Sequence, residues 1–365
     1  MTQPSLTPAE QPPTEQEARL EALTEAPIEA PIEAPIEAPI EAPPGLGQKI
    51  LQPRTLLGFL LAGVALFFVY RSGLKLDYRE VWSEMRHANM LILLTAFVIY
   101  YSSFIVRAKR WEVLLGNVGY SREQGYNMPS TAGLGEILYL SWFANCVTVA
   151  RLGDAYRGYM LKRAAGVSFA VTVGTILAER LVDIAVLAAM MALSALLAFR
   201  GALPQALEFA LLGGIGLTLA GLAGLASLRR IRPLVKRILP TRLFDFYSSL
   251  EVGVIGSFRR VPFLLALTLL GWIIEGLTLY LTAAAVGVPL SVAGAVIAAL
   301  ASSLLSTIPL SPSGLGFTES GTVLLLTSFG MAATPAAAVV LLSRVINYWS
   351  IVGFGAILYV FSGKK

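Results

Sequence analysis

Charged residues are scarce in this chain of 365 residues: Asp, Glu, Lys and Arg together make up only 14% of it. Hydrophobic residues make up 56%, and the mean hydropathy is +0.69. Both values lie far from ordinary soluble usage, so the composition excludes a soluble globular domain. We predict an all-α polytopic membrane protein.

Cysteine and histidine occur once each, as Cys146 and His87. One of each cannot build a disulfide or a Cys/His metal site within a monomer. The segments GLGEIL and PSGLGF lack the GxxxxGKS or GxxxxGKT pattern of an ATP-binding loop. Because no nucleophile is paired with a base, we expect neither an enzyme nor a bound cofactor or metal.

The charges that are present divide the chain in two. The first 48 residues hold nine Glu and one Arg, whereas the chain from Lys49 onward holds 27 basic and 14 acidic side chains. The basic residues cluster beside apolar segments. This position indicates that they set the membrane topology and contact lipid headgroups. We therefore do not expect nucleic acid as a partner.

The N-terminal segment repeats EAPI from Glu25 to Ile40. Proline at every fourth position removes helical hydrogen bonds, so residues 1–48 are predicted to be a disordered cytoplasmic tail, with a membrane domain over residues 49–365. A partner-binding tail is the alternative. The start has no positive n-region, so it is not a secretory signal.

Apolar segments predict about six to eight membrane-spanning helices, because a span needs about 20 residues. Two further stretches, Gly133 to Val149 and Ser291 to Leu310, break at Gly, Pro or charged residues and then continue as short segments. We interpret them as re-entrant hairpins. The six clear spans are Thr55–Tyr70, Met90–Val106, Phe169–Phe199, Leu203–Leu228, Pro262–Val286 and Ala336–Phe361.

The basic residues also predict an orientation in the cell inner membrane. The loop Arg229 to Arg260 carries eight of them, and Lys and Arg concentrate on the cytoplasmic side. Both termini then lie in the cytoplasm. The segment Arg71 to Arg86, with four basic residues outside, opposes this assignment.

The two broken regions repeat one order: apolar half-segment, glycine break, short apolar segment, then a span with an Arg. An offset of 163 to 164 residues superposes Gly153 on Gly316 and Arg180 on Arg344. The halves, residues 90–228 and 261–361, would be inverted, as in many transporters with a site between repeats. Two unrelated glycine breaks are the alternative.

Ionised groups inside spans need an explanation, since each costs roughly 2.5–3.5 kcal/mol at the bilayer centre. Glu179 and Asp183 lie on one helical face, and Arg180 is spaced to pair with Asp183. A purely structural pair is as plausible as a functional one. Glu275 has no local basic partner, so it must be protonated, paired across helices or facing water.

The segment VARLGDAYRGYMLKR places Asp154 one helical turn from Arg151 and from Arg157. Two guanidinium groups suit a phosphate, so we predict a polar cavity for an anionic headgroup; charges reaching the interface are the alternative. In the second copy, the glycine-rich segment PLSPSGLGFTES offers backbone N–H groups for an anion. RAKRW, from Arg107, is predicted to be an interfacial anchor, although its arginines could meet a phosphate.

These motifs resemble the family of lysylphosphatidylglycerol synthase transmembrane regions, also called flippase-like domains or UPF0104-type membrane proteins. The resemblance covers roughly Leu56 to Phe361. It rests on RAKRW, the block NCVTVARLGDAYR, the span AERLVDIAVL, PLSPSGLGFTES and LSRVINYW. The family pattern has Pro and Gly where this chain has Val149 and Ser313, so the first break is expected to be softer than usual.

The resemblance implies movement of polar or anionic lipids between leaflets, as in the flippase half of aminoacyl-phosphatidylglycerol synthases. Relatives are linked to hopanoid and polyprenyl-glycolipid pathways. Nothing follows Lys365, so we expect no aminoacyl-transferase domain and no lipid aminoacylation.

We therefore predict a lipid flippase or scramblase-like transporter of a phospholipid, polyprenyl-linked or hopanoid-type lipid. The alternatives are an integral-membrane enzyme and a non-transporting scaffold in lipid or glycolipid biosynthesis. Membrane lipids with an anionic headgroup are the expected partners, and a homo-oligomer or a lipid-synthesis enzyme partner stays open. The candidate substrate-binding residues are Arg107, Arg110, Asn145, Arg151, Asp154, Arg157, Glu179, Arg180, Asp183, Glu275, Gly314, Gly316, Glu319 and Arg344.

Overall fold

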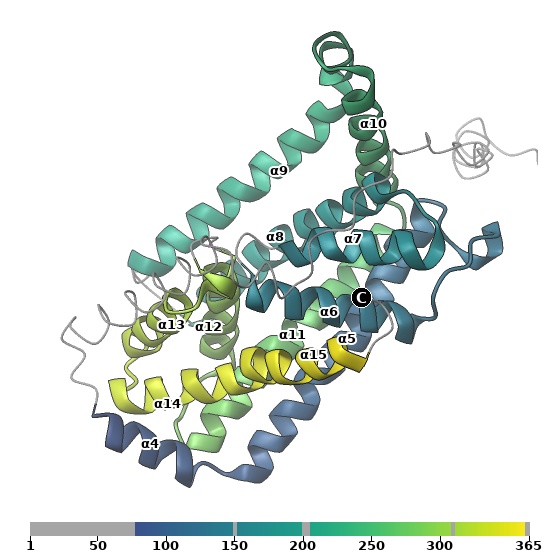
Figure 1. Cartoon of the computed structure of the whole chain (residues 1–365). Coiled ribbons are helices and arrows are strands. Elements are labelled where there is room, and N and C mark those ends of the chain that lie inside the picture. Colours follow the sequence, from purple (N-terminus) through teal and green to yellow (C-terminus); the bar gives the residue numbers. More distant parts are fainter. Residues whose placement is uncertain (1–76, 149–151, 199–204, 308–310, 362–365) are drawn as a thin grey trace, which may run out of the picture. The chain divides into compact units, whose positions relative to one another are not determined.

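A computed structural model of the protein describes residues 77–148, 152–198, 205–307 and 311–361. These residues belong to one structural unit, and every regular element in them is a helix (Figure 1). The all-α prediction is therefore confirmed for the described part of the chain. The predicted tail, the predicted span Thr55–Tyr70 and Arg151 lie outside the described residues.

Local sequence signals set the first two helices. Asp77 caps α4 (Tyr78–His87), because its Oδ1 accepts a hydrogen bond from the Arg79 N–H at 2.9 Å. Asn89 caps α5 (Met90–Asn117) in the same way. Helix α5 is eleven residues longer than the predicted span to Val106, because RAKRW continues the helix.

In the part of the chain that the structure describes, four helical segments are long and apolar enough to cross a membrane: Met90–Gln124, Leu211–Ile238, Val261–Val286 and Ala333–Phe361. The last is α14 and α15 joined by one π-helical turn, Val345–Trp349. A polytopic membrane fold follows from these spans. The helices from α8 onward that lie outside the hairpins are α8 (Phe169–Ala198), α9 (Gln205–Ile238), α10 (Thr241–Gly256), α11 (Val261–Val286), α14 (Ala333–Arg344) and α15 (Ser350–Phe361).

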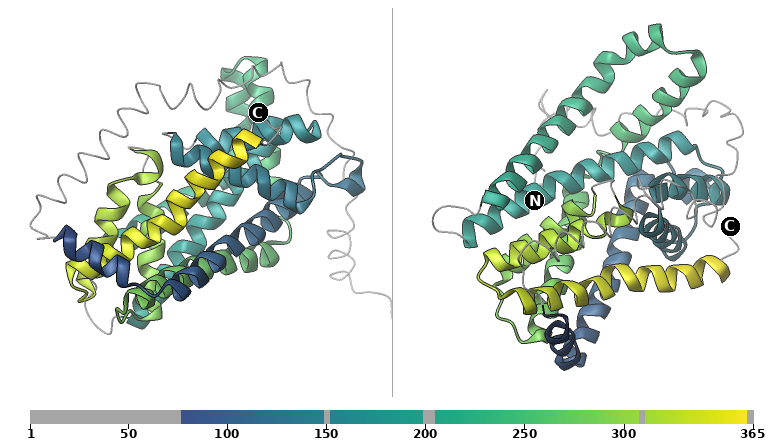
Figure 2. Two further views of the ribbon diagram at one scale, coloured as in Figure 1. Left: turned by 60° about the horizontal axis from the view of Figure 1, so that its bottom comes forward. Right: turned by 60° about the vertical axis from the view of Figure 1, so that its left-hand side comes forward.

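The basic segment Arg229 to Arg260 was wrongly interpreted as a loop. Helix α9 continues to Ile238, and α10 then packs against both α8 and α9 (Figure 2). Arg, Lys and Leu favour helices, so the charged stretch extends the helix beyond its apolar part. Eight basic side chains thus lie on or beside a helical pair.

The four helices of the two predicted interrupted segments are each too short to cross a bilayer, which takes about 20 residues. They form two hairpins, and they have 12 to 17 residues each. The predicted half-length segments are therefore confirmed as helix pairs. Hairpin 1 consists of α6 (Thr131–Val147) and α7 (Leu152–Ala165), and hairpin 2 of α12 (Val292–Leu305) and α13 (Phe317–Ser328).

The antiparallel pair α5 and α11 places the hairpins. At one end, the Asn89 N–H donates to the Ala285 carbonyl at 2.8 Å; at the other, Asn117 Nδ2 donates to the Ser257 carbonyl at 2.9 Å. Hairpin 2 follows the first end along the chain, and hairpin 1 follows the second. The hairpins therefore enter from opposite ends of α5, and their tips meet where Ser313 Oγ donates to the Asn145 carbonyl at 3.4 Å. This is the predicted inverted arrangement.

The structure changes the register of the repeat. Gly316 directly precedes α13, whereas Gly153 lies inside α7, so the glycines are not equivalent. Aligning the first residues of α7 and α13 superposes Leu152 on Phe317 instead. This shift of two residues brings Asp154 onto Glu319, each the third residue of its helix.

Apolar side chains cover the outside as well as the core. Met90 and Leu91 are 75% and 73% exposed at the start of α5, as expected for a surface that faces lipid. Inside, an aromatic cluster that includes Tyr100, Phe143 and Tyr348 packs around the meeting point of the hairpins. The hairpin tips are thereby held in the middle of the protein.

Candidate functional site

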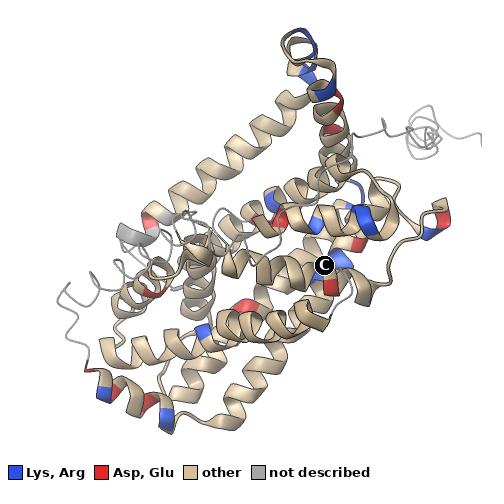
Figure 3. Ribbon diagram, viewed as in Figure 1, with Lys and Arg blue, Asp and Glu red and all other residues tan. Residues whose placement is uncertain are grey.

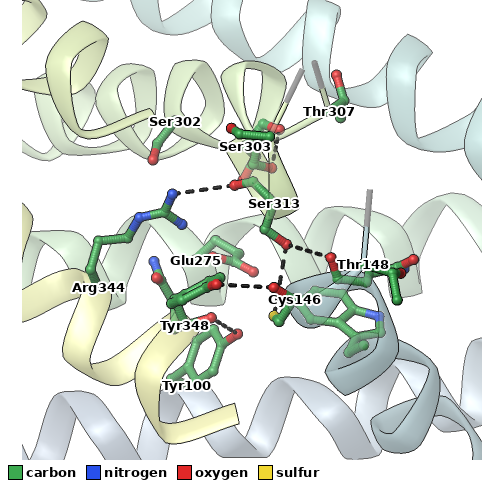
Figure 4. Close-up of a pocket in the computed structure, with 15 residues that line it drawn as sticks. Tyr100, Cys146, Thr148, Glu275, Ser302, Ser303, Thr307, Ser313, Arg344 and Tyr348 are labelled. Atoms are coloured by element: carbon green, nitrogen blue, oxygen red, sulfur yellow. Dashed lines mark hydrogen bonds between the residues drawn. The ribbon is translucent and has the colours of Figure 1, made fainter. Parts of the chain in front are cut away.

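A polar cavity of about 110 Å³ lies where the two hairpins meet (Figure 4). This exceeds the roughly 10–15 Å³ that one water needs. Helices α6 and α12 point their C-terminal turns at it, and α5, α11 and the π-helical turn close its sides. The lining residues are Tyr100, Trp142, Asn145, Cys146, Thr148, Glu275, Ser302, Ser303, Ser306, Thr307, Ser311, Ser313, Arg344, Asn347 and Tyr348.

A tight turn between α12 and α13 shapes the cavity wall. Gly314 has φ +66°, and a Cβ there would lie 2.7 Å from the Leu305 carbonyl oxygen, so only glycine fits. Ser313 also has a left-handed backbone, with φ 46° and ψ 35°. A residue with a side chain pays roughly 1–2 kcal/mol for this conformation.

Glu275 pairs with Arg107 of another helix. Pairing across helices was one of the three options predicted for this carboxylate. Arg107 Nη2 lies 2.8 Å from Glu275 Oε1, and the guanidinium also lies over the rings of Trp142 and Trp272, at 4.8 and 5.7 Å from their centroids. Arg107 is 6% exposed. RAKRW is therefore not an interfacial anchor. Arg107, Arg110 and Trp111 of the motif are buried in the helix bundle, whereas Lys109 is exposed.

Arg110 holds both predicted carboxylates of α8. Its guanidinium lies 2.7 Å from Glu179 Oε1 and 2.5 Å from Asp183 Oδ1, and it donates to Thr268 Oγ1 at 3.1 Å. All three charged groups are at most 7% exposed. The prediction that Glu179 and Asp183 share one helical face is thus confirmed, and the face is directed at α5.

Arg157 does not face a ligand. It is 1% exposed, its Nη2 lies 3.0 Å from Glu179 Oε2, and its guanidinium stacks 3.8 Å from the Trp111 ring centroid. The prediction that Arg157 holds a phosphate does not fit this position, because the aromatic ring and carboxylate already enclose the guanidinium. The sequence pattern could not show these partners, which come from α5 and α8.

In each repeat half, an ion pair at matching helix positions links the second short helix to the following span. In the first, Arg180 Nη2 lies 3.2 Å from Asp154 Oδ1; the local pair of Arg180 with Asp183 is longer, at 3.5 Å. In the second, Arg344 Nε lies 2.5 Å from Glu319 Oε1. The two pairs use equivalent positions, which supports a true internal repeat.

Glu319 also closes the anion-binding turn that the sequence suggested. Its Oε2 accepts a hydrogen bond from the Gly316 N–H at 2.6 Å. In the first half, Asn145 Oδ1 accepts from the Gly153 N–H at 2.9 Å. Side chains of the protein therefore already accept the hydrogen bonds that these two backbone N–H groups could donate to an anion.

The described charges of the site balance. Figure 3 shows blue and red segments beside one another within the helices. The expected positive bias is absent from the described residues of the site, where five guanidinium groups face five carboxylates. They also contain no group of three His, Cys, Asp or Glu side chains that could hold a metal. The five arginines are Arg107, Arg110, Arg157, Arg180 and Arg344; the five carboxylates are Asp154, Glu179, Asp183, Glu275 and Glu319.

The structure thus divides the predicted residues. Asn145, Glu275 and Arg344 line the cavity, and Gly314 and Gly316 shape its wall. The other described candidates lie in the ion-pair clusters, and Arg151 lies outside the described residues. Sequence analysis missed the hydroxyl-bearing residues of the lining because they carry no charge. The signal was present in ASSLLSTIPLS, where Ser and Thr recur within an apolar stretch.

Comparison with known proteins gives consistent matches. The family profile described as "Lysylphosphatidylglycerol synthase TM region" matches residues 55–355. A UPF0104 membrane protein of Methanocaldococcus jannaschii is 34% identical over 220 residues, which cover 60% of this chain and 93% of that protein. A UPF0104 membrane protein of Methanothermobacter thermautotrophicus is 25% identical over 291 residues, 74% of this chain and 83% of that protein.

A third relative is larger than this chain. "Glycosyltransferase AglD" of Haloferax volcanii is 27% identical over 338 residues, covering 81% of this chain but only 52% of that protein. The family match spans most of the chain and includes both hairpins and the spans around the cavity. The chain therefore belongs to the lysylphosphatidylglycerol synthase TM region family.

Proposed function

We propose that this protein moves a polar lipid between the leaflets of the cell inner membrane, as a flippase or scramblase-like transporter. The observation that carries the proposal is the polar cavity at the meeting point of two oppositely inserted hairpins (Figure 4). Polar groups in the hydrocarbon region are costly unless they serve a path, and inverted repeats place such a path at their interface.

The hairpins suggest how the path would open. Their tips are joined by the weak contact of Ser313 with Asn145, whereas stronger ion pairs tie each hairpin to its own span. Moving one hairpin with its span would expose the cavity to one leaflet, and moving the other would expose it to the opposite leaflet. The headgroup would cross in the cavity while the acyl or polyprenyl chains stay in lipid.

We place both termini in the cytoplasm, with the basic helical pair α9 and α10 on that side. The positive-inside rule supports this orientation. Net transport would follow the gradient of the lipid or of protons, with the buried carboxylates as candidate proton carriers.

The test uses purified protein in liposomes that contain a fluorescent polar lipid. An impermeant quencher added outside removes the signal of the outer leaflet only. Protein-free liposomes should lose about half of their fluorescence. If the protein exchanges the lipid between leaflets, the loss should exceed one half. Formation of a new lipid species would instead favour an enzyme, and neither exchange nor product would favour a scaffold.

A single substitution makes this test specific to the hairpins. Ser313 Oγ lies 3.7 Å from Cys146 Sγ, so Ser313→Cys places two thiols at the meeting point of the tips. Oxidation should lock the tips and stop exchange, and a reductant should restore it. The matched control is Ser313→Cys with Cys146→Ser, which cannot form the bond. Full exchange by the oxidised, crosslinked protein would contradict the mechanism.

A further inference from the structure

The lining of the cavity carries no uncompensated charge in the described residues. Glu275 is paired with Arg107 at 2.8 Å, and Arg344 with Glu319 at 2.5 Å. A phosphate bound there would compete with Glu319 for the guanidinium, and an ammonium group would compete with Arg107 for the carboxylate. Neither ionic headgroup therefore finds a ready counter-charge.

Helix geometry disfavours an anion further. The cavity is lined by the last turns of α6, through Asn145 and Cys146, and of α12, through Ser302 and Ser303. A helix C-terminus carries a partial negative charge of roughly half an elementary charge. Two such ends directed at one cavity repel a phosphate.

Three hydroxyl groups of the lining present only acceptors to a ligand. The hydroxyl of Thr148 donates to the Ala144 carbonyl at 2.6 Å. The hydroxyl of Ser306 donates to the Ser303 carbonyl at 2.7 Å, and that of Tyr348 to the Cys146 carbonyl at 2.9 Å. Because each hydroxyl has one hydrogen, these groups can offer a ligand only their oxygen lone pairs.

Asn347 adds a further acceptor, from the π-helical turn. Its Nδ2 donates to Ser343 Oγ, while its buried Oδ1 accepts no hydrogen bond from the described residues. An unpartnered buried oxygen is rare unless a ligand or water satisfies it. A π-helical turn is often found at a functional site, and this one carries Asn347 and Tyr348 into the cavity wall.

A ligand that fits this lining has several hydrogen-bond donors and no net charge on the part inside the cavity. We infer that the cavity binds a polyol group, the glycerol or sugar of a lipid headgroup, in preference to a bare phosphate or an ammonium group. Vicinal hydroxyls donate to the lining oxygens and accept from Arg344. The ring of Trp142, which also lines the cavity, suits the apolar face of a sugar or glycerol carbon chain. The inference rests on the proposed function and names its substrate class.

Four labelled lipids with identical chains and different headgroups test the inference in the liposome assay. They are a glycosyl diacylglycerol, phosphatidylglycerol, phosphatidic acid and phosphatidylethanolamine. The first two should exchange at least about fivefold faster than the last two, and their ratio separates sugar from glycerol. Equal exchange of all four, or fastest exchange of phosphatidic acid or phosphatidylethanolamine, would overturn the inference and leave the transport function standing.

Binding in detergent separates failure of the inference from failure of the function. Native mass spectrometry with the same lipids should show the polyol lipids retained in preference to the other two. That result without any exchange would uphold the inference and reject transport, whereas indifferent binding would reject the inference.

Asn347→Leu should weaken retention of the polyol lipids by about three- to tenfold, the effect of one lost hydrogen bond. The control is Ser227→Ala, which removes a hydroxyl of exposed α9 that donates only to the Ala223 carbonyl. Unchanged retention in a folded Asn347→Leu protein would count against the assigned acceptor.

Discussion

Removing Arg107 should destabilise the protein far more than removing the charge of its partner Glu275. The Arg107 side chain is buried and that of Glu275 is largely covered, at 7% and 12% exposure. Arg107→Met leaves the Glu275 carboxylate buried without its counter-charge, and breaking a buried pair in this way costs about 3–5 kcal/mol. Glu275→Gln removes the charge but keeps an oxygen that can accept from Arg107.

The aromatic contacts increase this asymmetry. After Glu275→Gln, the Arg107 guanidinium still lies over Trp142 and Trp272, and such contacts contribute about 0.5–2 kcal/mol each. The expected loss is therefore only about 1–2 kcal/mol. The double variant Arg107→Met with Glu275→Met has no unpaired charge, so its free energy of unfolding should lie within about 2 kcal/mol of the unmodified protein.

The assay is equilibrium unfolding in mixed detergent micelles, followed by circular dichroism, for the unmodified protein and the three variants. The size-exclusion profile of each variant before unfolding checks that it starts from the same folded state. Equal losses for the two single variants, or a double variant whose loss equals the sum of two large losses, would refute the reasoning.

Three further substitutions test the structure at single positions. Arg157→Lys should lower stability by about 1–2 kcal/mol, since an ammonium cannot reproduce the planar stack on Trp111, and the same micelle unfolding measures it. Gly153→Ala should impair folding, measured as the monodisperse yield, because its Cβ would overlap the Ser141 carbonyl; Gly116→Ala, with nothing within 4 Å, is the control and should be neutral or stabilising. Ser313→Gly should be about 1–2 kcal/mol more stable than Ser313→Ala, because only the former relieves the left-handed backbone; equal melting of the two would contradict the strain.

Periodicity and length were sufficient to predict α8, α11 and the two interrupted hairpins, whereas the predicted span Thr55–Tyr70 lies outside the described residues. Helices α8 and α11 begin and end within a residue or two of the predicted bounds. The spacing of Glu179 and Asp183 also predicted their shared face, because helical geometry is local. The missed extensions of α5 and α9 share one cause: charged residues ended the apolar pattern but did not end the helix.

The partners of the buried charges could not be predicted in the same way. Arg107 and Glu275 are 168 residues apart, so only the packing of α5 on α11 brings them together. The local pattern favoured Arg157 as a phosphate ligand, because its neighbours in sequence are Asp154 and Arg151, whereas its actual contacts are Trp111 and Glu179. A single sequence contains no direct signal for such contacts.

The long separations between ion-pair partners have a consequence for biogenesis. Helix α5 carries Arg107 and Arg110 into the membrane, but their carboxylate partners come from α8 and α11, which are made later. Each unpartnered arginine costs roughly 2.5–3.5 kcal/mol on insertion scales. During synthesis, the apolar part of α5 is long enough to cross a membrane, but its two arginines find their partners only when the helices behind it arrive. The protein must assemble its charged interior as it inserts, so a ribosome-bound chain truncated after α5 should leave that helix outside the bilayer in a larger fraction of molecules than the full chain does.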